Sequence, residues 1–171
     1  MQLLSLVRVR ALLYVAALTL IVFNLAGCSK ESPPPILGTF HMGERIQVGP
    51  MTYNVLESRW KPALKDDGTG KPPKERYLLV KVTATNGGGS TNTIPSFTIV
   101  NSRGESYSEV TEGVQDVPNY LGIIRKVEPA QTEQGWVVFD APVGAYQLMI
   151  SDNGEPGSEK YARVDLPVSL E

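Results

Sequence analysis

The spacing of turn-forming residues after position 28 constrains the fold of this chain more than any other feature. Glycine, proline and asparagine recur so often there that no segment keeps a helical period over three turns. The intervals between them are short and rich in β-branched and aromatic residues, as in residues 76–86, where apolar and polar side chains alternate. This pattern predicts an all-β fold, either a β-sandwich or a barrel.

About seven to nine short strands are expected on this basis. They cover residues 46–48, 52–60, 76–86, 97–100, 105–107, 123–127, 136–139, 146–150 and 161–168. Within residues 52–60, the alternation places Tyr53, Val55 and Glu57 on one face. The single cysteine excludes a disulfide between two sheets, so Trp60 and Trp136 are expected to fill the centre of the core instead.

The N-terminal residues 1–27 have the pattern of a signal peptide. Arg8 and Arg10 supply the positive charge that precedes an apolar run. That run covers residues 11–23, and its length of about 13 residues is short of the roughly 20 needed to span a bilayer as a helix. A secretion signal is therefore favoured, and a retained membrane anchor is the alternative.

The apolar run ends at Leu25-Ala26-Gly27-Cys28, which resembles the lipobox of bacterial lipoproteins. We expect cleavage between Gly27 and Cys28 and a lipid group on the Cys28 thiol, which makes the membrane a binding partner. Ser29 rather than aspartate follows the cysteine. By resemblance to Gram-negative sorting rules, this places the protein in the outer membrane, facing the periplasm. In other bacteria the anchor would lie on the outer face of the cell membrane.

A proline-rich tether is expected between the anchor and the folded domain. It occupies residues 28–42 together with the lipidated cysteine, and the domain occupies residues 43–171. Three consecutive prolines, Pro33 to Pro35, favour the extended polyproline II form. The tether would hold the domain away from the lipid surface.

Charge and composition exclude several classes of function. The chain has 16 basic and 18 acidic residues, and the signal segment removes two arginines, which leaves 16 − 2 = 14 basic residues. Nucleic-acid binding needs a basic stripe, so we exclude nucleic acid as a partner. The one histidine, His41, and the one cysteine cannot build a catalytic triad or a typical zinc site. No catalytic residue, metal or cofactor is predicted, and His41 is expected to be a solvated tether residue.

Three groups of residues resemble the telokin-like domain of unknown function found in bacterial lipoproteins. They are residues 77–86, ending in Asn86; residues 97–101 with Gly104 and Tyr107; and residues 127–132 with 135–142. Ala130 stands where that family usually has glycine, so a slightly different turn is expected there. The resemblance extends over residues 43–168. It implies an immunoglobulin-like β-sandwich on a lipid anchor, with no family active site.

Residues 108–122 show no regular period, and long loops of this kind are often functional. In one interpretation their acidic and apolar side chains form a partner-binding edge. The candidate residues are Glu109, Glu112, Asp116, Tyr120 and Leu121. In the other interpretation, which we favour, Val114, Val117, Tyr120 and Leu121 cap one end of the sandwich. A second long, polar loop is expected at residues 61–75.

Together these patterns predict an anchored, exported lipoprotein whose domain binds an envelope protein or another envelope component and is not an enzyme. Two alternatives stay open. By resemblance alone, the protein is a lipoprotein of phage superinfection exclusion or immunity, because some relatives are reported to have that role. Loop carboxylates at Asp66, Asp67, Asp152 and Glu155 could instead serve calcium-dependent carbohydrate binding or hydrolysis.

Overall fold

The computed structural model describes residues 36–65, 67–155 and 158–168. Within these residues the chain forms eleven strands. They are β1 (Ile36–His41), β2 (Ile46–Val48), β3 (Met51–Lys61), β4 (Tyr77–Asn86), β5 (Asn92–Thr93), β6 (Thr98–Asn101), β7 (Ser106–Ser108), β8 (Lys126–Val127), β9 (Thr132–Asp140), β10 (Tyr146–Ser151) and β11 (Tyr161–Leu166). This part of the chain contains no helix that could cross a membrane. The predicted all-β class is confirmed.

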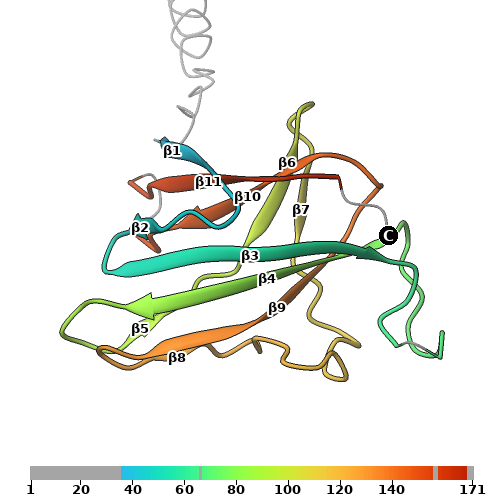
Figure 1. Ribbon diagram of the computed structural model, residues 1–171, viewed down its shortest axis with the longest axis horizontal. Helices are drawn as coiled ribbons and strands as arrows, with labels where there is room; N and C mark the ends of the chain where they lie inside the picture. Colours follow the sequence, from blue (N-terminus) through green and yellow to red (C-terminus); the bar gives the residue numbers. More distant parts are fainter. Residues whose placement is uncertain (1–35, 66, 156–157, 169–171) are drawn as a thin grey trace, which may run out of the picture. The chain divides into compact units, whose positions relative to one another are not determined.

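The strands pack as two layers (Figure 1). One layer has the order β1-β11-β10-β6-β7 and is named sheet A here; the other has the order β2-β3-β4-β9 and is named sheet B. Strands β5 and β8 pair separately with each other. Apart from β1 and β5, every strand of the described residues overlaps a predicted one, so the β-sandwich follows the sequence pattern closely.

Strand β1 corrects the predicted tether and the start of the domain. Residues 36–41 were assigned to the tether by their proximity to the prolines, but they pair in parallel with β11. This pairing covers the backbone of β11, which would otherwise be an open sheet edge. Only Gly38 and Phe40 of β1 are half-buried, so the side-chain pattern hardly signals the strand. His41 is solvated as expected, with 79% of its side chain exposed, but it belongs to β1.

A β-bulge in β3 explains why its alternation is imperfect. Tyr53 and Val55 face the core, and the pairing with β4 shifts between Val55 and Glu57. The extra residue moves the following side chains to the opposite faces, so Leu56 and Glu57 are both exposed. Glu57 therefore does not share a face with Tyr53 and Val55, and Trp60 returns to the core.

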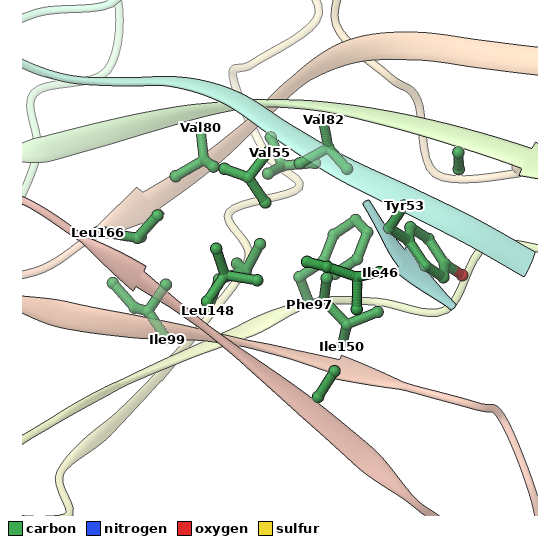
Figure 2. Packing of buried hydrophobic residues seen from close by; sticks show 14 of the residues in the cluster. Ile46, Tyr53, Val55, Val80, Val82, Phe97, Ile99, Leu148, Ile150 and Leu166 are labelled. Carbon is green, nitrogen blue, oxygen red and sulfur yellow. The ribbon is translucent and has the colours of Figure 1, made fainter. Parts of the chain in front are cut away.

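The main core lies between the two sheets (Figure 2). Val55, Val80 and Val82 of sheet B face side chains of sheet A. The opposing residues are Ile99, Leu148, Ile150 and Leu166. The Tyr53 ring meets Phe97 edge-on, with ring centroids 6.1 Å apart. Trp60 lies in this core as predicted, whereas Trp136 does not.

Asn86 fixes the end of β4. Its side chain is fully buried, and its Nδ2 donates hydrogen bonds to the carbonyls of Ser90 and Val127, each at 2.8 Å. Its Oδ1 accepts hydrogen bonds from Gly88 N and Asn92 Nδ2. A buried amide needs such partners because leaving it unpaired is unfavourable. The strand-terminal asparagine therefore has a structural role, joining β4 to the segments that carry β5 and β8.

Candidate binding site

Sheet B buries apolar side chains on both of its faces. In β4, Leu78 and Val80 point into the sandwich, whereas Tyr77 and Leu79 lie on the outer face and are equally buried. Residues 62–76, named the β3–β4 loop, and residues 109–125, named the β7–β8 loop, contribute to a second apolar cluster on this face. This outer cluster comprises Leu64, Tyr77, Leu79, Val114, Val117, Trp136 and Val138.

The outer cluster contains or contacts the apolar residues Val110, Val114, Val117 and Tyr120 of the segment 108–122. Val114 and Val117 are buried in the cluster, and Tyr120 packs against it. The favoured interpretation, that these residues form a cap, is therefore confirmed for Val114, Val117 and Tyr120. The predicted location is wrong, because the loop covers the outer face of sheet B and not an end of the sandwich. Trp136 points into this cluster, which corrects its expected position at the centre of the main core.

Gly135 of β9 allows the β7–β8 loop to run against the sheet. A Cβ atom at this position would lie 2.6 Å from the carbonyl oxygen of Asn119 and 2.8 Å from the backbone of Leu121. The same segments are joined by hydrogen bonds from Trp136 N to Asn119 O at 2.8 Å and from Leu121 N to Trp136 O at 2.9 Å. No side chain fits in this space, so the close approach of the loop backbone to β9 requires glycine at position 135.

A buried ion pair holds the two ends of the β7–β8 loop together. Glu109 at its start and Arg125 at its end bind each other, and each side chain is only 3% exposed. Glu109 Oε1 also accepts a hydrogen bond from Phe97 N at 2.5 Å, and Arg125 Nε donates one to the carbonyl of Gly122 at 2.5 Å. The remaining guanidinium nitrogens reach Glu109 and the carbonyl of Pro95. With these partners the two buried charges are compensated.

Two adjacent isoleucines project from the segment that Arg125 holds. Ile123 is 62% exposed and Ile124 is 84% exposed, more than any other large apolar side chain among the described residues. The preceding Gly122 has a φ of 85°, a conformation that favours glycine and turns the chain sharply. The predicted strand over residues 123–127 is therefore confirmed only for Lys126 and Val127, which form β8.

Two surface ion pairs join the β3–β4 loop to the β7–β8 loop. Lys65 Nζ lies 3.0 Å from Asp116, and Lys71 Nζ lies 2.9 Å from Glu112. The hydrogen bond from Lys71 lowers the pKa of Glu112, and the hydrogen bond to Asp116 raises the pKa of Lys65. All four groups are solvent-exposed, so each pair contributes little to stability and can rearrange readily.

A cleft of about 680 Å³ opens beside these loops. Its apolar lining comes from Leu64, Leu79, Val117 and Pro118, and its charged lining from Arg59, Lys61, Lys65, Asp67 and Asp116. The Arg59 guanidinium carbon lies 4.3 Å from the ring centroid of Trp136, which places it in cation–π contact. The cleft thus combines an apolar lining with a cationic group held against an aromatic ring.

The predicted partner-binding residues fall into three different environments. Glu109 is buried in the ion pair, so its predicted place on a binding edge is corrected. Glu112 and Asp116 are exposed, and Tyr120 and Leu121 are half-buried against the clusters. Cys28 and the cleavage site at Gly27 lie outside the described residues. The exposure of Ile123 and Ile124 was not predicted from the sequence, although the adjacent Gly122 is a signal for a turn there.

Two of the loop carboxylates considered above, Asp67 and Asp152, accept hydrogen bonds within turns, and Asp66 lies outside the described residues. Asp67 Oδ1 accepts hydrogen bonds from the backbone N–H and hydroxyl of Thr69, which lower the pKa of Asp67. Asp152 Oδ1 accepts hydrogen bonds from the backbone N–H groups of Gly154 and Lys160, both at 3.0 Å. In the described parts of the chain, no group of three or more histidine, cysteine, aspartate or glutamate side chains is arranged to hold a metal ion.

Comparison with known proteins agrees with this architecture. A family model described as "Domain of unknown function (DUF4352)" matches residues 40–163. This range contains the segments on which the resemblance to a domain of unknown function was based. No curated protein matches the sequence.

Several solved bacterial structures share the fold. The yjhA protein of Bacillus subtilis aligns with a TM-score of 0.57 and 15% identity, covering 74% of this chain and 99% of that protein. The secreted protein MPT63 of Mycobacterium tuberculosis aligns with a TM-score of 0.56 and 14% identity, covering 79% of this chain and 100% of MPT63. A "putative lipoprotein (ycdA)" of B. subtilis has a TM-score of 0.54 and 14% identity, covering 71% of this chain but only 38% of its own.

Proposed function

The chain belongs to the DUF4352 family, and from this premise we propose that it is an exported lipoprotein, anchored through Cys28, whose sandwich binds an envelope protein without catalysis. The N-terminal pattern of residues 1–28 supports export and anchoring. Two structural neighbours support export as well, because MPT63 is a secreted protein and the name of ycdA describes a lipoprotein. The scarcity of histidine and cysteine supports a role without catalysis.

The observation that carries the binding role is the exposed pair Ile123 and Ile124, which we name the Ile tip. Burying an exposed isoleucine side chain stabilises an interface by about 1.5–3 kcal/mol, so two adjacent isoleucines can act as an anchor for a partner. The buried Glu109–Arg125 pair fixes the backbone on both sides of the loop. A fixed tip loses little conformational entropy on binding, which favours affinity.

The position of the Ile tip favours a protein over the anchoring membrane as its partner. β1, the first described strand, lies on one side of the fold, and β8 with the preceding loop lies on the opposite side (Figure 1). A domain attached through β1 therefore presents the Ile tip away from its attachment point. We expect the partner to have an apolar pocket that receives the two side chains.

Site-specific photo-crosslinking in the native cell tests this proposal. A photoreactive residue at position 124 is expected to give one discrete crosslinked envelope protein, because Ile124 would be buried in the complex. The matched control places the same residue at Leu56, which is 44% exposed in β3. Ile123→Ser is expected to weaken the crosslink from position 124. Identical products from positions 124 and 56, or only lipid adducts at 124, would contradict the proposed protein partner.

A further inference from the structure

The cleft beside the two loops has the features of a ligand site, separate from the Ile tip. Its volume of about 680 Å³ lies within the range of about 300–1,000 Å³ that is typical of small-molecule pockets. Leu64, Leu79 and Val117 are buried parts of the outer cluster, so the apolar lining is fixed by the same packing that stabilises the loops. A preformed apolar lining of this kind suits the non-polar part of a small ligand.

Arg59 supplies the group that would recognise a ligand's charge. Its guanidinium lies against the Trp136 ring, which orients it beside the apolar lining. Among the described residues its Nε makes no hydrogen bond, although the atom is shielded from solvent. A ligand that enters from solvent would meet the outer guanidinium nitrogens rather than this shielded Nε. A carboxylate is the group that such a pair of N–H donors binds most completely, through two parallel hydrogen bonds.

The other charged side chains that line the cleft already have partners. Thr69 satisfies Asp67, Lys65 pairs with Asp116, and Lys61 also has an interaction partner. Arg59 is therefore the group through which the cleft would recognise a ligand's charge, and one guanidinium matches a single carboxylate better than a phosphate with two charges.

From these observations we propose that the cleft binds a small monocarboxylate that is attached to an apolar group. The carboxylate pairs with the guanidinium of Arg59, and the apolar group packs on the more accessible part of the apolar lining, at Leu64 and Pro118. The Lys65–Asp116 pair, which is exposed and joins the two loops beside the cleft, rearranges to admit the ligand. Both a free organic acid and the C-terminus of a peptide present this chemistry.

Fluorescence of Trp136 in the full-length protein in detergent micelles tests the proposal. The chain has two tryptophans, so Trp60→Phe leaves Trp136 as the only one, beside Arg59. Phenylacetate is expected to change the emission saturably, and the neutral phenylacetamide to bind at least about tenfold more weakly, because it lacks the charge-assisted hydrogen bonds. The same comparison is made with N-acetylphenylalanine, which represents the C-terminus of a peptide, and with its amide. Tighter binding of N-acetylphenylalanine than of phenylacetate would identify a peptide C-terminus as the ligand, and the reverse order would identify a free organic acid.

Two arginine variants test whether Arg59 binds the carboxylate. Arg59→Met is expected to weaken phenylacetate binding by about tenfold or more. Arg163→Met is the matched control, since Arg163 lies in β11 of sheet A and its Nε also makes no hydrogen bond within the described residues. Absence of saturable binding, equal binding of phenylacetamide, or unchanged affinity in Arg59→Met would overturn the proposal. The comparison of acid with amide in the unaltered cleft decides the case even where Arg59→Met unfolds.

Discussion

At the scale of single residues, Ala130 is the clearest case of strain in the described chain. It has a φ of 62°, and it follows Pro129 in a turn closed by a hydrogen bond from Gln131 N to Glu128 O at 3.1 Å. A positive φ at the third residue of a turn after proline is the position at which a type II turn favours glycine. The turn thus keeps the backbone that glycine would adopt, although the chain carries alanine.

Ala130→Gly is therefore expected to stabilise the protein by up to about 1 kcal/mol, because it removes the left-handed penalty of alanine, partly offset by greater freedom of the unfolded chain. Urea unfolding followed by circular dichroism measures the change. Ala145→Gly is the control at an exposed position with no positive φ, and it is expected to leave stability unchanged or to lower it. Equal effects of both substitutions would show that Ala130 is not strained.

The ion pair of Glu109 and Arg125 is buried, so each charge depends on the other for compensation. Glu109→Gln removes one charge and leaves Arg125 buried without its counter-charge, which is expected to destabilise the protein by roughly 3–5 kcal/mol. The double variant Glu109→Leu with Arg125→Met removes both charges and is expected to be more stable than Glu109→Gln alone. Thermal or urea unfolding compares the three proteins. A loss below about 1 kcal/mol in Glu109→Gln would be typical of a solvent-screened surface pair and would contradict the burial of the charges.

At the scale of elements, Gly135 links β9 to the β7–β8 loop. Gly135→Ala would place a Cβ atom 2.6 Å from Asn119 O, so the loop or the strand must shift. We expect a loss of about 1–3 kcal/mol, which is typical of overpacking. Gly89→Ala is the matched control, since a Cβ there meets no atom within 4 Å and the residue has no positive φ. An equally small effect of both substitutions would mean that the loop does not lie against β9.

Local pattern predicted the strands well where one face is buried and the other exposed. Residues 161–166 alternate in this way, and β11 lies where the sequence places it. Prediction failed where another segment decides the structure. β1 pairs with β11 from more than 100 residues away, and the bulge in β3 reverses the two faces at Leu56. Neither feature has a local signal, because backbone pairing does not depend on particular side chains.

The candidate sites were harder to predict for a related reason. The apolar residues of the β7–β8 loop could be recognised as a cap, because Val114 and Val117 need burial. Glu109 appeared to be a surface acid, since nothing near it in sequence reveals that Arg125 lies beside it. Conversely, Ile123 and Ile124 appeared to belong to a strand, although they are the most exposed large apolar residues of the described chain.

At the scale of the whole molecule, the fold separates three tasks. β1 closes the edge of sheet A directly after the residues predicted to form the tether, and the main core between the sheets provides stability. The loops over sheet B carry the Ile tip and form the cleft, so substitutions in these loops should alter binding more than folding wherever they avoid the outer cluster. This separation suits a tethered binding domain. That role requires the lipid anchor that we propose at Cys28.

The intact mass of the protein purified from its own membranes tests that assignment most directly. We expect a mass equal to residues 28–171 plus acyl chains, because the leader is removed and Cys28 carries the lipid. Cys28→Ala is the control and is expected to lose the acyl mass and the firm attachment to the membrane. A protein that keeps residues 1–27 and carries no lipid would contradict the anchored-lipoprotein account, and the N-terminal segment would then be a retained membrane segment.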